Sequence, residues 1–300
     1  MFKKIKYEVL LLLTAAMWGL QFPLTKFVGA SFDAIPILAV KYIVAVVALT
    51  FINIKKLKNI TRKMIVPCGL LGLLLVLHSF LQVQGLKYTS ASNSGFITST
   101  NVIFVPIFMF ILFREKPARN VVIGIILMLF GFLFTSEIVT IYPFKIGGQP
   151  LNVGDLLTLM SALFTGLYMI FNNRIAIKYD EDMANYIQFV FAAVASLILW
   201  PFAAEKNADF SSTVSVLVLI YCGVFATALG FLFLMKAQKP LGAVKTAVIS
   251  ASEPVFATIF ELFIPEPDGN FGTLTLTSVF GGLLILLGVL VTTALNTNKK

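Results

Sequence analysis

Long apolar runs separated by short polar breaks dominate this chain of 300 residues. A helix that crosses a bilayer needs about 20 mostly apolar residues. Ten runs reach that length: 7–28, 34–53, 64–86, 89–113, 119–137, 154–177, 183–203, 212–235, 242–263 and 275–296. The breaks between them carry charges, glycine and proline, as in "REKPAR" and "KIGGQPLNVGD". The pattern predicts an all-α integral membrane protein with ten transmembrane helices.

Composition supports this fold class. Hydrophobic residues make up 58% of the chain and charged residues 12%, whereas soluble domains have about 45–50% and about 25%. The N-terminal segment, "MFKKIKYEVLLLLTAAMWGL", has the basic start and apolar stretch of a signal peptide. The apolar run continues to about Val28 and more runs follow it, so we expect an uncleaved first helix.

Basic residues gather in alternate breaks, which orients the chain. If the N-terminus is cytoplasmic, nearly all lysines and arginines of the loops are cytoplasmic as well. The outside loops then contain only Lys87, Lys145 and Lys206. Short cytoplasmic loops are enriched in Lys and Arg, so we expect a multi-pass plasma-membrane protein with both termini cytoplasmic. The net charge of +9 lies in clusters between apolar runs and not on one face of a domain. The expected partner is therefore the lipid bilayer, and not a nucleic acid.

Two halves of the sequence resemble each other. The segment "LLLTAAMWGLQ" (11–21) aligns with "TLMSALFTGLY" (158–168). The segment "GIILMLFGFL" (124–133) aligns with "GLLILLGVLV" from Gly281 or Gly282, and its glycines repeat the spacing of Gly281 and Gly288. The segment "GLKYTSASNSGFITSTN" (85–101) aligns with "AQKPLGAVKTAVISASE" (237–253). The shared order predicts one membrane domain of two repeats, 1–150 and 151–300, with five helices each. Because five is odd, the repeats must cross the membrane in opposite senses, an arrangement typical of transporters with a midplane site.

The third alignment places polar residues in the middle of two apolar runs. Ser94, Thr98 and Asn101 fall at helical spacing, and their counterparts are Thr246, Ser250 and Glu253. Lipid cannot accommodate a carboxylate cheaply, so both polar stripes should face a cavity inside the protein. Pro254 follows Glu253 directly and should bend this helix near Ser250.

At these residues the chain resembles the drug/metabolite transporter superfamily of the EamA type. The resemblance rests on "AAMWGLQFPLTK" (15–26), "YTSASNSGFITSTNVIFVPIFMFILFREKP" (88–117), "NVGDLLTLMSALFTGLYMIFNNRIA" (152–176) and "SEPVFATIFELFIPE" (252–266). It implies ten helices in an inverted repeat, cytoplasmic termini, and export or exchange of small metabolites, often amino acids. It also implies a cavity among helices 1, 3, 4, 6, 8 and 9, with helices 5 and 10 toward a dimer-like or outer side.

Further candidates for the cavity wall lie at mid-depth in other predicted helices. His78, the only histidine, shares a helix face with Gln82, and the two could bind a solute or relay a proton. Trp18 could stack on a solute, although packing near Gly19 and Gly166 explains it equally well. Gln21 and its counterpart in the second repeat, Tyr168, complete the set.

Other polar residues favour structural roles. Lys41 lies deep in the second helix, where it could bind an anionic group, but pairing with Glu137 or Glu261 is favoured. Asn172–Arg174 should cap the cytoplasmic end of helix 6. The small residues of "GIILMLFGFL" should pack helix against helix.

We find no signature of a soluble enzyme. The sequence lacks GxxxxGK[ST], HExxH and GxSxG motifs, so we expect no catalytic residues, no cofactor and no transport driven by ATP bound to this chain. One histidine with no Cys or Asp cluster predicts no metal site. The sequence leaves the oligomeric state open between monomer and homodimer.

The sequence thus predicts a secondary transporter or facilitator that exports or exchanges a small metabolite, an amino acid or related amphipathic compound, by alternating access. The predicted substrate-binding residues are Trp18, Gln21, His78, Gln82, Ser94, Thr98, Asn101, Tyr168, Ser250 and Glu253. The alternatives are another substrate class, such as a nucleotide-sugar or a drug-like cation, and less favoured, a channel or an intramembrane enzyme.

Overall fold

The computed structural model describes residues 2–135, 139–140, 145–146, 152–204, 207–265 and 269–294. The first half contains α1 (Phe2–Val28), α2 (Ala34–Asn53), α3 (Arg62–Leu86), α4 (Ala91–Ser99), α5 (Asn101–Phe113) and α6 (Arg119–Thr135). The second contains α7 (Val153–Lys178), α8 (Glu181–Leu199), α9 (Thr213–Tyr221), the π-helical stretch η3 (Cys222–Leu229), α10 (Gly230–Leu241), α11 (Ala243–Ser250), α12 (Glu253–Glu261) and α13 (Leu276–Ala294). The chain also has two short 3₁₀ helices, η1 (Leu57–Asn59) and η2 (Trp200–Phe202). Two short strands, β1 (Val139–Thr140) and β2 (Lys145–Ile146), pair antiparallel.

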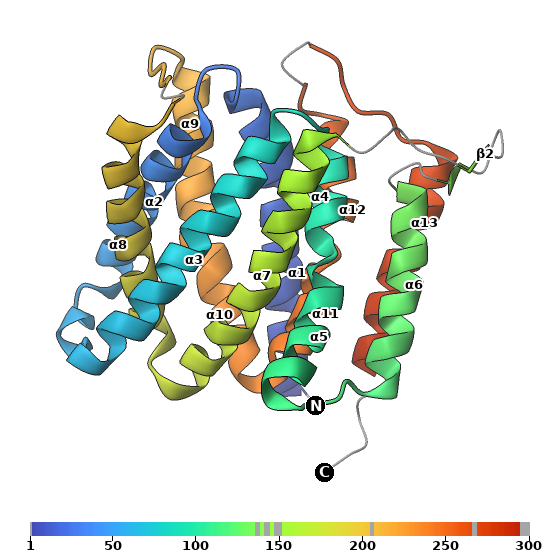
Figure 1. Cartoon of the computed structure of the whole chain (residues 1–300), viewed down its shortest axis with the longest axis horizontal. Helices are drawn as coiled ribbons and strands as arrows, with labels where there is room; N and C mark the ends of the chain where they lie inside the picture. Colours follow the sequence, from blue (N-terminus) through green and yellow to red (C-terminus); the bar gives the residue numbers. More distant parts are fainter. Residues whose placement is uncertain are drawn as a thin grey trace.

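These elements form ten membrane crossings, and the predicted all-α membrane architecture is confirmed. Within the described residues, nine helical stretches are long and apolar enough to span a bilayer, and α6 supplies a shorter tenth. Figure 1 shows the crossings side by side in one bundle, and α6 and α13 form a pair at its edge. The expected placement of helices 5 and 10 on the outside therefore matches α6 and α13.

Three of the predicted runs are interrupted and not continuous. The run 89–113 is divided between α4 and α5 at Thr100, where i→i+3 bonds replace the α-helical pattern (Thr100 N–H to Ile97 O, 3.1 Å; Ile103 N–H to Thr100 O, 2.9 Å). The run 212–235 contains η3. The run 242–263 breaks between Ser250 and Glu253, so the bend predicted from Pro254 is confirmed.

Glycines allow the closest helix contacts, as the sequence predicts for the segment 124–133. A Cβ atom on Gly124 would lie 2.7 Å from the carbonyl oxygen of Gly288 and would clash with the hydroxyl of Thr292. A Cβ on Gly131 would lie 2.6 Å from the carbonyl oxygen of Gly281. The α6–α13 pair is therefore packed backbone against backbone, as small residues permit in membrane helices.

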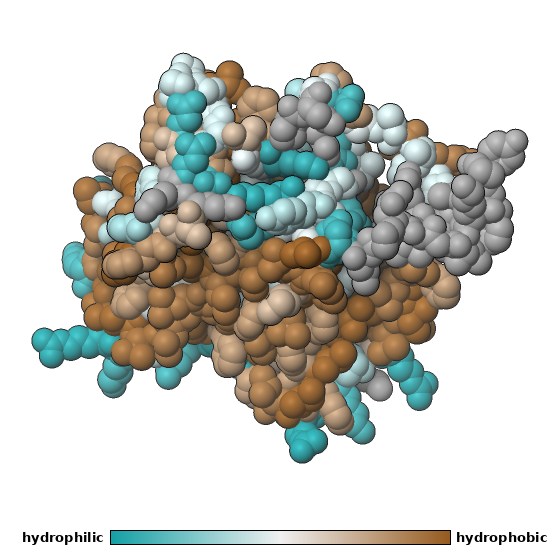
Figure 2. All heavy atoms as spheres, turned by 45° about the horizontal axis from the view of Figure 1, so that its top comes forward, coloured by the Kyte–Doolittle hydropathy of each residue, from teal (hydrophilic) through white to brown (hydrophobic). Residues whose placement is uncertain are grey.

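The two ends of the bundle are held by different polar contacts. We call the end where α1 begins the N-terminal face, and the opposite end, which carries the α1–α2 turn, the distal face (Figure 1). Ion pairs join Lys245 to Glu8 (2.7 Å), Lys239 to Glu181 (2.8 Å), and both Lys236 and Lys56 to Asp182 at the N-terminal face. Figure 2 shows a broad apolar band below the polar residues of the distal face, which is the surface expected to contact lipid.

Candidate functional site

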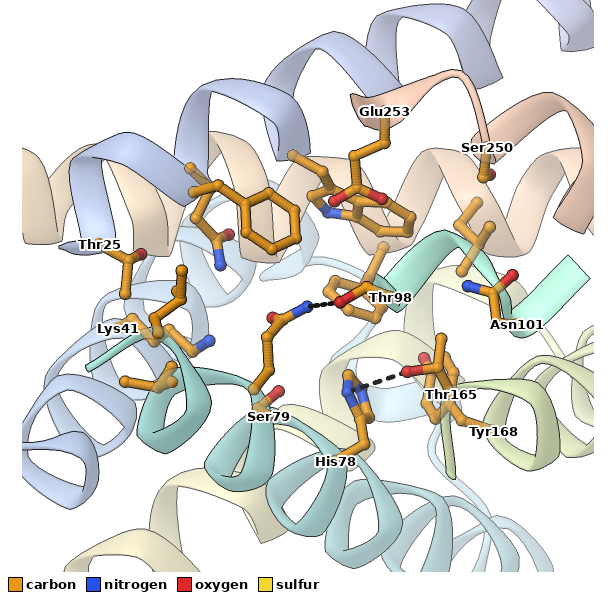
Figure 3. Close-up of a pocket in the computed structure, with 18 of the residues that line it drawn as sticks. Thr25, Lys41, His78, Ser79, Thr98, Asn101, Thr165, Tyr168, Ser250 and Glu253 are labelled. Atoms are coloured by element: carbon orange, nitrogen blue, oxygen red, sulfur yellow. Dashed lines mark hydrogen bonds between the residues drawn. The ribbon is translucent and has the colours of Figure 1, made fainter. Parts of the chain in front are cut away.

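A cavity lies inside the bundle, and nine of the ten predicted binding residues line it (Figure 3). They are Trp18, Gln21, His78, Gln82, Thr98, Asn101, Tyr168, Ser250 and Glu253. The walls come from α1, α3, α4, α5, α7, α10, α11 and α12, which correspond to the expected helices 1, 3, 4, 6, 8 and 9. The second helix, α2, also contributes, and this was not expected.

Ser94 does not line this cavity, unlike the other nine predicted residues. Its hydroxyl oxygen lies 3.4 Å from the hydroxyl oxygen of Thr158 on α7. One residue earlier, the Asn93 side chain donates to Asp155 (2.8 Å), which fixes this end of α4 against α7. Thr246, the counterpart of Ser94 in the second half, is buried and also lies outside the cavity wall. Of the two polar stripes, only Thr98 and Asn101 in the first and Ser250 and Glu253 in the second line the cavity.

Glu253 is the carboxylate of the site. It is the first residue of α12, points into the cavity in Figure 3 and is 7% exposed. Its carboxylate makes no hydrogen bond or ion pair with any residue that the structure describes. The start of a helix favours a negative charge, but a buried carboxylate ordinarily needs a direct partner as well.

Aromatic rings form one wall of the cavity. The Trp18 indole N–H donates to the carbonyl oxygen of Ala226 (2.8 Å), and its ring centroid lies 5.0 Å from that of Phe231. Tyr168 packs edge-on against Phe231 at 5.6 Å and lies 5.7 Å from His78, while its hydroxyl donates to Gln188 Oε1 (2.9 Å). The polar atoms of Trp18 and Tyr168 are thus engaged within the protein, and the ring surfaces are left for contact with a solute.

The two glycines named with Trp18 each allow a close contact with another helix. Gly19 lies against α12, where an added Cβ would be 2.9 Å from the carbonyl oxygen of Glu253. Gly166 instead lies against Phe104 on α5. The glycine that accommodates Trp18 is Gly230, whose Cβ would come 2.9 Å from the indole nitrogen.

The polar groups of the cavity are only partly satisfied. The Gln82 side-chain amide donates to the Thr98 hydroxyl (3.2 Å), and His78 Nδ1 lies 3.4 Å from the Thr165 hydroxyl. His78 and Gln82 therefore both line the cavity, but each contacts a different hydroxyl group. His78 Nε2, Asn101 Oδ1 and Ser250 Oγ have no hydrogen-bond partner among the described residues. Buried polar atoms in this state are rare in native proteins and call for a ligand or water.

Lys41 is a cavity residue that sequence reasoning assigned a structural role. It is 4% exposed, and its ammonium group lies 5.1 Å from the centre of the Tyr42 ring. It forms no ion pair with Glu261 or any other described residue, and Glu137 lies outside the described residues. The sequence does carry a signal for Lys41 as a cavity residue: it lies deep in an apolar run, and no acidic residue lies one helical turn away to pair with it.

The cavity leads toward the distal face. It has a volume of about 50 Å³, enough for a few water molecules, since one water needs about 10–15 Å³. A second cavity of about 310 Å³ adjoins it, shares Thr25, Val83 and Leu86 with it, and contains Lys26 and Lys87 near the distal face. A solute could therefore approach the site from that side.

Buried amides separate the site from the N-terminal face. Asn172 Nδ2 donates to Gln238 Oε1 (2.7 Å), and Asn173 Nδ2 donates to the Gln238 carbonyl oxygen (2.7 Å). Helix α7 continues to Lys178, so Asn172–Arg174 do not cap it, and that expectation is wrong. The asparagines instead join α7 to α10 and close the bundle below the cavity.

Within the described residues, no group of three or more His, Cys, Asp and Glu side chains could hold a metal ion. The two cysteines, Cys68 and Cys222, are buried free thiols.

The sequence model of the EamA-like transporter family matches residues 5–137 and again residues 152–294. The chain belongs to the EamA-like transporter family. This family lies in the drug/metabolite transporter superfamily, so the chain is a membrane transporter. The division into repeats at about residue 150 and their opposite orientation stay predictions.

Two relatives of this EamA-like transporter cover most of its length. A protein of Archaeoglobus fulgidus named "uncharacterized transporter" is 28% identical over 96% of this chain and 86% of its own. A protein of Clostridium kluyveri with the same name is 25% identical over 98% of this chain and 94% of its own length. A solved crystal structure superposes with a TM-score of 0.74 over 97% of both chains at 16% sequence identity, which supports the fold alone.

Proposed function

We propose that this EamA-like transporter is a secondary transporter or facilitator that exports or exchanges a small amphipathic metabolite, an amino acid or a relative. The solute binds in the central cavity, with its amine at Glu253 and its apolar part on the rings of Trp18 and Phe231. The observation that carries the proposal is the unpartnered carboxylate of Glu253 beside an aromatic wall.

The energetics of burial favour a cationic ligand at this position. A charge at the centre of a membrane helix is disfavoured by about 2.5–3.5 kcal/mol even on the mildest scales. Among the residues that the structure describes, none offsets this by pairing with Glu253. An ammonium group would do so, and it would also be attracted by the face of the Trp18 ring.

Amide, hydroxyl and imidazole groups supply the orienting contacts. Asn101 Oδ1 and Ser250 Oγ lack partners among the described residues and line the same cavity as Glu253. His78 Nε2 is in the same state. These are the few well-placed polar groups that orient a ligand in a mostly apolar pocket.

We propose that the N-terminal face is cytoplasmic in the plasma membrane, because the lysines of the α2–α3 connection and of the C-terminal end of α10 lie there. In the conformation described, the cavity adjoins the distal cavity, and buried amides close the opposite side. Transport then requires a second conformation in which the amide contacts open. The inverted repeats 1–150 and 151–300 would supply two equivalent halves for that exchange.

The test is counterflow in proteoliposomes loaded with unlabelled amino acids, polyamines, organic cations and nucleotide-sugars in turn. Saturable uptake of a labelled amino acid by the wild type, lost in Glu253→Gln, supports the proposal. Glu115→Gln is the matched control, since Glu115 is exposed and pairs with Arg174 away from the cavity. Uptake that is equal in Glu253→Gln would refute the assigned role of Glu253.

The same panel tests the alternatives. The aromatic wall with one carboxylate also suits an organic cation, which would then exchange where amino acids do not. A nucleotide-sugar would need several cations, and Lys41 is the single lysine or arginine lining the central cavity in the described part of the chain. Flux far above carrier rates without counterflow would indicate a channel.

A further inference from the structure

The central cavity contains a second buried charge, which the proposed role of Glu253 does not use. Lys41 on α2 lines the cavity and is buried, with its ammonium nitrogen 5.1 Å from the centre of the Tyr42 ring. No carboxylate among the described residues lies within 4.0 Å of its ammonium nitrogen. A contact of this kind with a ring stabilises a cation less than an ion pair does.

Lys41 and Glu253 do not neutralise each other, although they share one cavity. Figure 3 shows Lys41 beside Thr25 at one end and Glu253 near Ser250 at the other, with the hydrogen bond from Gln82 to Thr98 between them. The structure therefore holds two buried charges of opposite sign, each without a partner in the described protein. Intramembrane charges in transporters ordinarily pair or contact the transported species.

The surroundings of Lys41 suit an anion. Thr25 and Ser79 line the cavity at the same end, and both hydroxyl-bearing side chains are buried there. Hydroxyl groups can donate hydrogen bonds to a carboxylate alongside an ammonium group. The adjoining cavity on the distal side is also lined by Lys26 and Lys87, and Lys87 is already paired with Asp33 (2.7 Å), so the buried ammonium group of Lys41 is the cation left for an anion among the described residues that line the two cavities.

We propose that Lys41 binds the anionic group, a carboxylate, of the same solute whose amine meets Glu253. The transported solute is therefore a zwitterion that lies across the cavity, and Lys41 sets the preference for a zwitterion over the corresponding amine. This inference rests on the proposed function, because it needs a solute bound at Glu253.

The experiment compares purified wild type with Lys41→Met, Lys41→Arg and Lys58→Met. Two sets of probes are used: 5-aminopentanoate with pentylamine and pentanoate, and phenylalanine with phenethylamine and 3-phenylpropanoate. Binding is measured as ligand-dependent thermal stabilisation and as competition in counterflow. Lys58→Met is the matched control. Lys58 is an exposed lysine in η1, so its substitution removes the same charge outside the cavity.

We expect the wild type to prefer at least one zwitterion over its amine by about tenfold, equivalent to about 1.4 kcal/mol. Lys41→Met should bind both equally, with amine binding kept, while Lys41→Arg and Lys58→Met retain the preference. A preference that survives in Lys41→Met would overturn the proposal, as would a wild type that prefers no zwitterion. Zwitterion binding that is abolished by Glu253→Gln but unchanged in Lys41→Met would overturn the anion subsite alone. No binding of any probe by the wild type would overturn the proposed function with it.

Discussion

The indole N–H of Trp18 on α1 donates a hydrogen bond of 2.8 Å to the carbonyl oxygen of Ala226, which lies in the π-helical stretch η3. This bond joins the first half of the chain to the second beside the cavity. In a π-helix the i→i−4 pattern is replaced, and such stretches are frequent at functional sites. The contact fixes the plane of the ring that forms the aromatic wall with Phe231.

We expect Trp18→Phe to destabilise the protein and to weaken solute binding, although an aromatic ring is kept. The variant leaves the carbonyl of a buried residue, Ala226, without its side-chain donor, a loss of about 1–3 kcal/mol. Thermal unfolding in detergent measures the first effect and ligand-dependent stabilisation the second. Trp200→Phe, which changes the other tryptophan in η2, should stay within about 0.5 kcal/mol of wild type. Equal losses in both variants would show that the Ala226 bond has no special importance.

Close packing of α6 on α13 predicts that Gly124→Ala is strongly destabilising. The added methyl group would meet the Gly288 carbonyl oxygen at 2.7 Å, so the two helices must separate. Overpacking of this kind typically reduces stability by about 1–3 kcal/mol. Gly282→Ala on α13 is the control, because its nearest neighbour, Val255, lies at an ordinary 3.8 Å. A melting temperature for Gly124→Ala that equals the control would contradict the tight helix contact.

The Asp33 carboxylate on the distal face predicts a pH-dependent contribution to stability. It accepts hydrogen bonds from Lys87 Nζ (2.7 Å) and from the backbone N–H of Asn207 (2.7 Å), which ties the α1–α2 turn to the segment after α8. Partial burial raises the pKa of Asp33, but these hydrogen bonds and the charge of Lys87 together lower this pKa below its usual value.

A carboxylate whose pKa is lower in the folded than in the unfolded protein stabilises the fold when ionised. Its contribution is complete above the unfolded pKa of about 3.9 and is lost as the pH falls through the lower folded pKa. We therefore expect Asp33→Asn to melt below wild type at pH 7, with a gap that narrows below about pH 4. Melting curves between pH 7 and pH 3 test this, and a gap that is independent of pH would contradict it.

The buried amides below the cavity predict an asymmetry between two glutamines. Gln238→Leu removes the acceptor of Asn172 and the donor to the Met169 carbonyl oxygen (3.1 Å), so buried polar groups lose their partners. We expect a loss of about 1–3 kcal/mol. Gln84→Leu should be tolerated, because its partly exposed side chain makes no hydrogen bond with a described residue and lines a largely apolar groove. Comparable melting temperatures for the two variants would show that the amide contacts do not hold α7 to α10.

Much of the fold follows from the sequence because lipid restricts what a chain can do. Apolar length and the breaks between runs were sufficient to place ten crossings, and Pro254 located the break before α12. The break at Thr100 has no such signal, since Thr100 is an ordinary residue and the proline that follows, Pro106, lies inside α5. The stretch η3 likewise has no proline or other evident signal in its sequence.

The cavity was partly predictable for a related reason. A polar residue deep in an apolar run must face inward, which identifies Thr98, Asn101 and Glu253 without a structure. The same rule cannot tell a cavity from a buried contact between helices, so it does not separate Ser94, which contacts Thr158, from Lys41, which lines the cavity. Whether a polar side chain finds a partner depends on the neighbouring helix, as Asn172 and Gln238 show.

The central claim is that Glu253 binds the cationic group of a solute in the cavity, and equilibrium binding tests it most directly. Purified protein is titrated with the labelled solute that counterflow identifies, for wild type, Glu253→Gln and Glu115→Gln. We expect one saturable site per chain in wild type and Glu115→Gln, and affinity at least about tenfold weaker, or about 1.4 kcal/mol, in Glu253→Gln. Equal affinity in all three proteins would contradict the account and return Glu253 to a structural role at the start of α12.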